Sequence, residues 1–199
     1  EHSLKRVEKR ANKQGISLSE IRYVFLTHAH DDHAGFLNEL LSKYPDLKVV
    51  IHHQAIPVLL RGQNSFSGGC SSLLALAFCR FMGLIGKGKH LFPAVDKQYI
   101  DRLIEITPQN QANIENILHG KILFTPGHTA DSISLKMGNK IFCGDAAMNG
   151  IPSLKRVTIW IENKKAFQNS WKLLIDEKAD WIFPAHGKPF RREELQKYI

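Results

Sequence analysis

The chain has 199 residues, of which 43% are hydrophobic, and this length is enough for one folded domain with a substantial core. Lys and Arg outnumber Asp and Glu by 27 to 19, which gives a net charge of +8. This charge favours anionic partners, but the basic residues are scattered, so a solvated basic surface is the simpler interpretation. Cys70, Cys79 and Cys143 form no CxxC pair and are odd in number, which argues against a disulfide framework and predicts a cytoplasmic protein.

The chain in order begins with alternating helices and strands. We expect helices at residues 2–14, 32–42 and 55–61, and strands at 22–27 and 48–52. From Tyr99 onward the stretches GKILFT, SISLKM and NKIFCG predict strands, followed by a helix at 164–177, the short strand WIF and a terminal helix. This order predicts the α/β or α+β class, with at least one large sheet in a single domain that covers residues 1–199.

Residues 63–98 depart from this rhythm and are interpreted as a helical insertion. Within them the segment SSLLALAFCRFMGLIG is the most apolar of the chain, but Arg80 interrupts it and it is short for a membrane span, so we expect no stable membrane insertion. Its helix is apolar on more than one side. Four roles of this helix remain open: an ordinary core helix, a lid over a substrate pocket, a dimer contact and a membrane-surface contact. Of the last three we favour the lid, which predicts a substrate with an apolar portion.

The stretch LTHAHDDHAG, residues 26–35, crowds three histidines and two aspartates behind a predicted strand. His28 and His30 are separated by one residue on extended chain, so their side chains leave the same side and can bind one metal ion. Asp32 and His33 lie where the next helix begins and point to a neighbouring position, which suits a second ion. Imidazole and carboxylate ligands without thiolate favour zinc, with iron and manganese as alternatives. The competing interpretation, in which Asp32 only caps the helix, explains fewer of these residues.

Three further ligand candidates each follow a predicted strand: His128 in TPGHTADS, Asp145 in FCGDAA and His186 in FPAHGKP. A glycine stands beside each of them and permits a tight turn. Taken singly, each residue is a weak candidate, since such positions are commonly turn residues. With the first cluster they make five histidines and two aspartates, which is enough for two adjacent ions. His90 is expected to be solvated, and Cys143 to be a small buried strand residue.

In this order, these motifs resemble the metallo-β-lactamase superfamily, whose HxHxDH signature matches residues 28–33. The resemblance implies an αβ/βα sandwich of two sheets with outer helices. It also implies that His28, His30 and His128 hold one metal ion, that Asp32, His33 and His186 hold a second, and that Asp145 bridges them. The strands that usually precede the signature in this family are missing here, so we expect either a fragment of a longer polypeptide or a homo-oligomer that completes the sheet.

Two metal ions predict hydrolysis, with Asp32 as the residue that carries a proton to the leaving group. Asp31 is expected to face the other way, as a cap or a support for the ligands. The leading hypothesis is a hydrolase of a small ester, thioester or lactone. One alternative is a phosphodiesterase acting on nucleic acid, which the net positive charge favours. Another is an iron-dependent oxygenase. A third is a noncatalytic binding module, and the complete set of metal ligands argues against it. No motif names the substrate.

Overall fold

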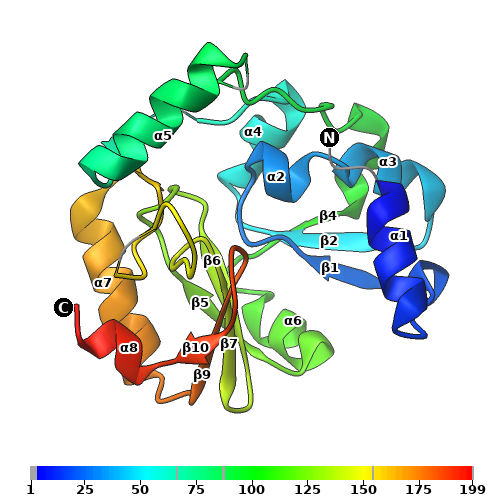
Figure 1. The fold of residues 1–199 in the computed structure, drawn as a ribbon. Coiled ribbons are helices and arrows are strands. Elements are labelled where there is room, and N and C mark those ends of the chain that lie inside the picture. Colours follow the sequence, from blue (N-terminus) through cyan, green and yellow to red (C-terminus); the bar gives the residue numbers. More distant parts are fainter. Residues whose placement is uncertain (1–3, 66, 87, 154, 199) are drawn as a thin grey trace. The chain divides into compact units, whose positions relative to one another are not determined.

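The computed structural model describes residues 4–65, 67–86, 88–153 and 155–198 of the chain. These residues form sheets of three, five and two strands together with α-helices (Figure 1). The chain divides into two compact units: unit 1 consists of Glu1–Asn64 and His90–Ile106, and unit 2 of Ser65–Lys89 and Thr107–Ile199. The mixed α/β class expected from the sequence is confirmed, whereas the assignment of the chain to a single domain stays a prediction.

Unit 1 is built on a parallel sheet with the strand order β1-β2-β4. Its strands are β1 (Tyr23–Phe25), β2 (Lys48–Ile51) and β4 (Leu103–Glu105). Its helices are α1 (Leu4–Lys13), α2 (Asp31–Ala34), α3 (Leu37–Lys43) and α4 (Ala55–Arg61), with 3-10 helices at Leu18–Glu20 and Lys97–Arg102. Apolar side chains of α1, α3 and α4 pack with those of β2 into one core. Val24 of β1, the strand that precedes the histidine cluster, packs against this core.

The helix expected at residues 32–42 is two helices, because the chain leaves the helical conformation at Phe36, with φ −112° and ψ 7°. The break lets α3 place Leu37, Leu40 and Leu41 in the core. The separate α2 has only four residues and carries the Asp-Asp-His part of the motif. Residues 2 and 3 of the first expected helix lie outside the described part of the chain.

Unit 2 contains the five-stranded sheet, with the order β10-β9-β7-β6-β5. Its strands are β5 (Lys121–Phe124), β6 (Ile133–Met137), β7 (Lys140–Gly144), β9 (Trp181–Pro184) and β10 (Phe190–Arg191). The pairs β5–β6 and β6–β7 are antiparallel and β7–β9 is parallel, so β5, β7 and β9 run in the same direction. Their carboxyl ends therefore lie at one edge of the sheet, which is where ligand candidates follow each of them.

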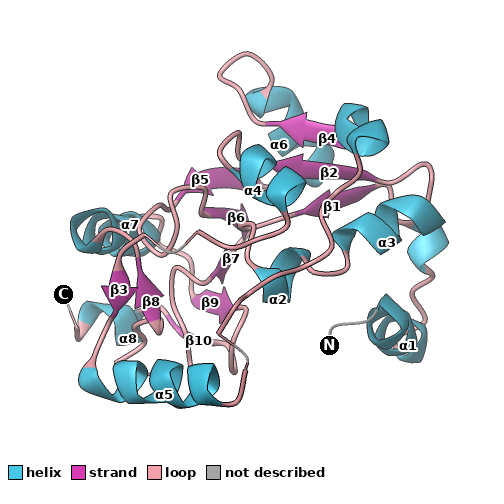
Figure 2. Ribbon diagram, turned by 90° about the horizontal axis from the view of Figure 1, so that it is seen from above, coloured by secondary structure: helices cyan, strands magenta, loops and turns pink. Residues whose placement is uncertain are grey.

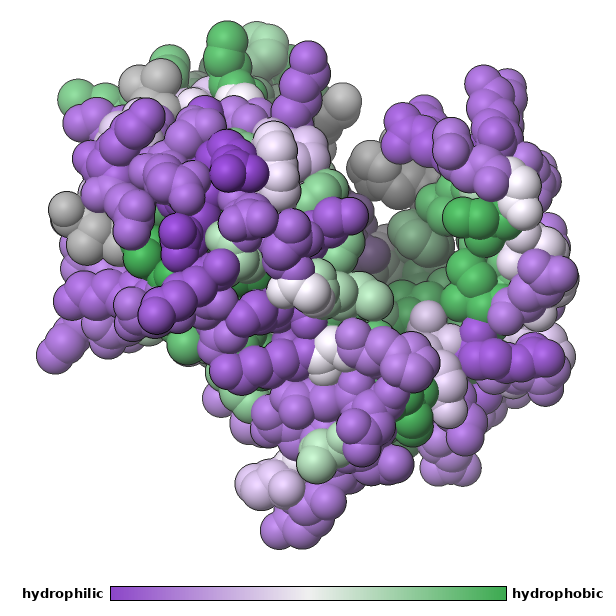
Figure 3. All heavy atoms as spheres, turned by 90° about the horizontal axis from the view of Figure 1, so that it is seen from below, coloured by the Kyte–Doolittle hydropathy of each residue, from purple (hydrophilic) through white to green (hydrophobic). Residues whose placement is uncertain are grey.

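Helices α7 (Lys164–Asp176) and α8 (Glu193–Gln196) pack on one face of this sheet. Phe167, Trp171 and Leu174 of α7 are buried against Ile141 and Ile182 of the strands. The opposite face is partly exposed, because β7 alternates buried with exposed residues. Aromatic side chains are among those exposed on it. On the face of the molecule drawn in Figure 3 most residues are hydrophilic, with hydrophobic residues at a few places.

Helix α6 (Gln111–Leu118) was not expected from the sequence, which predicts mostly strands from Tyr99 onward. Of its eight residues only Ile114 is buried, and Ile117 is 39% exposed, so little of the helix packs into a core. The helix is fixed instead by polar contacts, because Glu115 accepts hydrogen bonds from the Gln111 side chain and from the backbone N–H of Ile122 in β5.

The segment expected as an insertion supplies β3 (Gly69–Cys70) and α5 (Leu73–Leu84) to unit 2. Strand β3 pairs antiparallel with β8 (Trp160–Ile161), and α5 lies next to β3 (Figure 2). The interpretation of α5 as an ordinary core helix is wrong, because Ala75 is its only buried residue. We call its exposed side the outer face of α5, and it consists of Leu73, Leu74, Phe78, Phe81, Leu84 and the adjoining Ile85.

Candidate metal centre

Four of the predicted ligands form a cluster in unit 1, directly after β1. The bond from the Leu26 N–H to the Val50 carbonyl holds the end of this strand against β2. The ring centroids of His28 and His30 are 4.7 Å apart, and those of His28 and His33 are 4.0 Å apart. The side chains of His28 and His30 therefore lie close together, as their spacing predicts.

Asp32 belongs to the same cluster, and its Oδ1 lies 3.7 Å from Nε2 of His33. Both residues stand in α2, whose N-cap is His30 in an extended conformation. The carbonyl of His30 accepts from the N–H groups of His33 and Ala34, at 3.0 and 2.7 Å. The same peptide thus ends the extended stretch and begins the helix, which explains why two pairs of ligand-type residues fit into six positions.

Asp31 is held away from this cluster by two residues that follow much later in the sequence. Its N–H donates to Asn64 Oδ1 at 2.8 Å, and its Oδ1 accepts from Asn64 Nδ2 at 2.8 Å. Nδ1 of His90 lies 3.2 Å from the same carboxylate oxygen and acts as a donor to it. The supporting role expected for Asp31 agrees with these contacts, whereas the expectation that His90 is simply solvated is wrong.

The hydrogen bond between Asp31 and His90 shifts the pKa of both groups. Burial raises the pKa of Asp31, but the hydrogen bonds from His90 and Asn64 outweigh it and leave the pKa below its usual value. The same hydrogen bond to Asp31 raises the pKa of His90. Asp31 is therefore a carboxylate that anchors the start of α2, so that the orientation of Asp32 and His33 depends on it.

The other three predicted ligands form a cluster in unit 2, at the carboxyl edge shared by β5, β7 and β9. Oδ2 of Asp145 lies 3.6 Å from Nε2 of His128 and 3.5 Å from Nε2 of His186. His128 and Asp145 are buried, while the side chain of His186 is 38% exposed. One carboxylate oxygen thus stands between two imidazoles that are 58 positions apart in the sequence.

The loop that carries His128 is fixed by the segment around β8. Nδ1 of His128 donates to the carbonyl of Trp160 at 2.8 Å, because a carbonyl oxygen can only accept. The N–H of Glu162 donates to the Gly127 carbonyl at 2.8 Å, and its Oε2 accepts from the Ala130 N–H at 2.8 Å. Sequence reasoning missed Trp160 and Glu162, and a backbone carbonyl such as that of Trp160 leaves no signal in the sequence.

Glycines let the backbone turn at these positions, as the sequence predicts. Gly127 has φ +135°, and a Cβ there would lie 2.3 Å from the backbone nitrogen of Phe167. Gly187 has φ +98°, and a Cβ there would lie 1.7 Å from the carbonyl oxygen of Asn149. No larger residue fits either place without moving the chain, so both turns bring the adjacent histidine close to neighbouring backbone.

The residues in each cluster fit a divalent metal ion. In unit 2 the tautomer of His128 leaves a lone pair on Nε2, and this nitrogen faces a carboxylate oxygen at 3.6 Å, which is longer than a hydrogen bond. Two ligand atoms on one tetrahedral zinc ion stand about 3.4 Å apart, given metal–ligand distances of about 2.0–2.2 Å. The His–Asp distances in both clusters are close to this value, and the donors are all imidazole and carboxylate.

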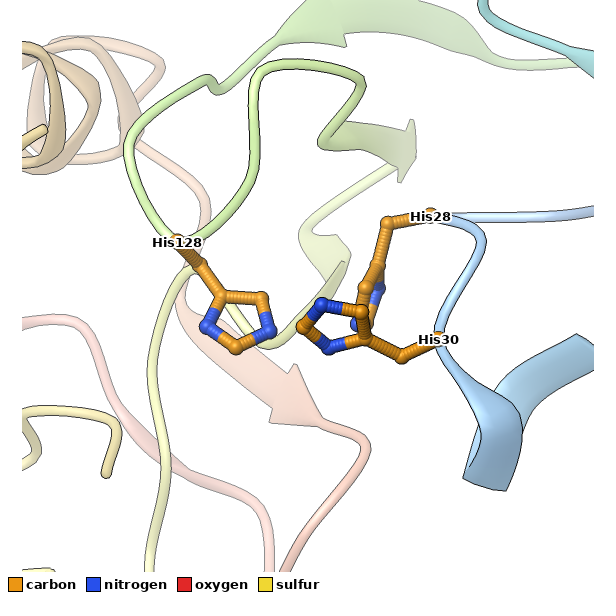
Figure 4. Close-up of side chains that lie close together, drawn as sticks. All are labelled: His28, His30 and His128. Atoms are coloured by element: carbon orange, nitrogen blue, oxygen red, sulfur yellow. The ribbon is translucent and has the colours of Figure 1, made fainter. Parts of the chain in front are cut away.

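Figure 4 shows three of these side chains as sticks: His28 and His30, which come from the segment after β1, and His128, which comes from the loop after β5. Each unit by itself thus brings its share of the predicted ligands together. Cys143, in contrast, is buried in β7, as expected for a small strand residue, and burial raises the pKa of its thiol to about 12. It is a poor thiolate donor.

Comparison with known proteins agrees with this pattern. The family model of the metallo-beta-lactamase superfamily matches residues 3–186. The chain belongs to the metallo-beta-lactamase superfamily. The match includes all seven predicted ligands, from His28 to His186, and the family fold expected from the sequence is thereby confirmed.

A curated relative is the metallo-beta-lactamase fold-containing protein ST1585 of Sulfurisphaera tokodaii, which is 28% identical over 178 residues. The match covers 85% of this chain and 62% of the relative, so the chain spans less than two thirds of that protein. The crystal structure of ST1585 from Sulfolobus tokodaii aligns with a TM-score of 0.59 at 21% identity, covering 89% of this chain and 66% of that one.

Another solved structure of this fold is TTHA1623 in a di-iron-bound form. It aligns with a TM-score of 0.62 at 20% identity and covers 98% of this chain and 82% of that one. The B3 metallo-beta-lactamase BLEG-1 aligns with a TM-score of 0.60 at 15% identity, covering 98% of this chain and 81% of that one. At these identities the likeness shows a shared fold. Separately, among the described residues no helix is long and apolar enough to cross a membrane.

Proposed function

We propose that this protein is a metal-dependent hydrolase that uses two divalent ions. His28, His30 and His128 would hold the first ion, Asp32, His33 and His186 the second, and Asp145 would bridge them. The observation that carries the proposal is the position of Asp145 Oδ2, 3.6 and 3.5 Å from the Nε2 atoms of two histidines assigned to different ions. A single carboxylate oxygen in this place suits a bridging ligand.

Zinc is the metal we expect, since all seven donors are imidazole or carboxylate. The di-iron-bound form of TTHA1623 supports iron as an alternative, and manganese suits the same donors. When bound, the ions would lower the pKa of water and polarise the oxygen of a carbonyl or phosphoryl group. Every other part of the chemistry falls to the side chains of the chain itself.

Asp32 is the residue we assign to proton transfer, from the attacking water to the leaving group. Its carboxylate lies beside His33, and its place in α2 is fixed by the contacts of Asp31 with Asn64 and His90. A carboxylate held in this way keeps its orientation while it gains and loses a proton. We assign Asp31 and His90 as positioning residues, because their hydrogen bonds with each other and with Asn64 anchor the start of α2.

The substrate we propose is a small ester, thioester or lactone with an apolar portion. A phosphodiesterase that acts on nucleic acid is the second candidate, and the net charge of +8 favours it. A panel of p-nitrophenyl esters, acyl thioesters, lactones and bis-p-nitrophenyl phosphate separates the two. Preferential turnover of the phosphodiester would replace the first candidate by the second.

The proposed role of Asp32 is tested by the substitution Asp32→Asn, which preserves size but removes the proton carrier and an anionic ligand. We expect turnover of the best panel substrate to fall by about 100-fold or more, while the urea unfolding midpoint stays near that of the parent. Asp46→Asn is the matched control, because Asp46 is an exposed carboxylate in the same unit that pairs with Arg22. Equal turnover in Asp32→Asn and in the control would remove Asp32 from the mechanism.

A further inference from the structure

The outer face of α5 exposes more apolar surface than a solvated helix needs. Leu73 and Leu84, at the two ends of the helix, are 85% and 86% exposed, and Phe81 between them is 58% exposed. The packed side of the helix carries Ala75 and is apolar as well. Arg80 is the single charged residue of α5. Contiguous apolar surface of this kind marks a site of interaction.

The sequence around this face contains basic residues and no acidic ones. Residues 65–89 contain Arg80, Lys87 and Lys89 but no Asp or Glu, although Lys87 lies outside the described residues. A groove of about 760 Å³ runs from Gly69–Ser71, just before α5 begins, to helix α7. Its lining includes Lys164, Lys165 and Lys172. Positive charge therefore lies beside the segment that leads into α5, and it follows the end of the helix in the sequence.

The length of α5 determines how it could meet a lipid bilayer. Its 12 residues extend over about 18 Å, at about 1.5 Å per residue, whereas the hydrocarbon core of a bilayer is about 30 Å thick. The helix is too short to span the bilayer but can lie in the interface, with Leu and Phe side chains toward the acyl chains. Basic side chains beside such a helix contact anionic headgroups.

A second copy of the chain is a less suitable occupant. In a two-fold symmetric dimer through α5, the same surface faces itself, so Arg80 and Lys89 of one protomer would approach those of the other. Residues 65–89 supply no carboxylate to offset this repulsion, and the chain as a whole carries a charge of +8. An anionic surface would offset both the basic residues beside α5 and the net positive charge of the chain.

We propose that the outer face of α5 docks on the surface of an anionic membrane. Leu73, Phe81 and Leu84 enter the boundary between headgroups and acyl chains, and the flanking lysines and Arg80 contact lipid phosphates. This docking surface contains none of the predicted metal ligands, so its test needs no catalytic readout.

The test is co-sedimentation of the full chain with vesicles of phosphatidylcholine alone or mixed with phosphatidylglycerol. We expect binding to the mixed vesicles that weakens as salt is raised, and at least tenfold weaker binding to phosphatidylcholine alone. The double variant Leu73→Ser/Leu84→Ser should bind the mixed vesicles at least tenfold more weakly than the parent. Ile117→Ser, a substitution of an exposed apolar residue on α6, is the matched control and should bind like the parent.

Both leucines are exposed, so the double variant should keep the circular dichroism spectrum and urea midpoint of the parent. Absence of parental binding to the mixed vesicles would overturn the proposal, as would equal binding by parent and double variant. Sedimentation equilibrium gives the third outcome. If the parent forms dimers that the double variant lacks, and neither binds vesicles, a second copy covers this face and the lipid proposal is wrong.

Discussion

Replacing Gly127 by alanine should damage the fold and the predicted metal centre together. Gly127 has φ +135°, a conformation that costs a residue with a Cβ about 1–3 kcal/mol. The new Cβ would also lie 2.3 Å from the nitrogen and 2.4 Å from the Cα of Phe167, at the buried side of α7. Relief of such an overlap by backbone movement costs about another 1–3 kcal/mol. We therefore expect Gly127→Ala to lose about 4 kcal/mol of unfolding free energy.

Gly138→Ala is the matched control for this prediction. Gly138 also has a positive φ, +57°, but a Cβ there meets nothing within 4 Å. Only the conformational cost of about 1–2 kcal/mol applies to it. Urea unfolding followed by tryptophan fluorescence measures both variants against the parent. Equal losses in the two variants would contradict this prediction, because the contact with Phe167 would then carry no cost.

The same substitution has an expected effect on the metal centre. Gly127 precedes His128, and its carbonyl accepts the hydrogen bond from the Glu162 N–H that holds the loop. Movement of Gly127 therefore displaces the imidazole from the Trp160 carbonyl and from Asp145. We expect Gly127→Ala to retain less metal than Gly138→Ala after dialysis against a weak chelator, under conditions in which both variants are folded.

Two further predictions concern unit 2. Burial raises the pKa of Glu177, but hydrogen bonds from Lys121 and Lys136 outweigh it and hold the pKa below its usual value. Glu177→Gln should therefore lose about 1 kcal/mol of unfolding free energy at pH 7. Urea titrations should show this loss disappear as the pH falls through the lowered pKa of Glu177. A loss that is independent of pH would contradict the pairing of Glu177 with the two lysines. Trp171→Phe removes the bond from the buried indole N–H to the Ala146 carbonyl, 2.6 Å long, and should cost about 1–3 kcal/mol in the same assay, whereas an unchanged midpoint would show that the bond contributes little.

The part of the site that is local in sequence could be predicted well. His28 and His30 are neighbours on one side of extended chain, so spacing alone brings their side chains together. The convergence of His128, Asp145 and His186 needed the resemblance to a family, because it depends on β5, β7 and β9 running in the same direction. That direction is a property of the sheet order, which the sequence of each strand does not contain.

Contacts that depend on backbone atoms or on distant residues could not be predicted. His90 follows Asp31 by 59 positions, and only the folding of unit 1 brings its ring to that carboxylate. The tautomer of His128 depends on the Trp160 carbonyl, which any residue at that position would supply. Helix α6 was missed because its apolar residues at helical spacing, Ile114, Ile117 and Leu118, span little more than one turn, and so short a pattern does not separate a helix from a strand.

The exposure of α5 shows a different limit of sequence patterns. Its residues are as apolar as those of a buried helix, and the sequence therefore allowed a core position. The structure leaves Leu73 and Leu84 almost fully exposed, although nothing in their own side chains distinguishes them from core leucines. Whether an apolar helix is buried depends on which elements pack against it. The sequence pattern shows which faces of the helix are apolar, but it does not show which elements lie against those faces.

The proposed binuclear centre is tested by elemental analysis of the purified protein, after loading with zinc, iron or manganese and removal of free metal. We expect two metal ions per chain in the parent, and a ratio near one in His186→Ala, where a ligand of one proposed ion is lost. A ratio near one in the parent that His186→Ala leaves unchanged, or no retained metal at all, would contradict the binuclear centre and the hydrolysis proposed from it.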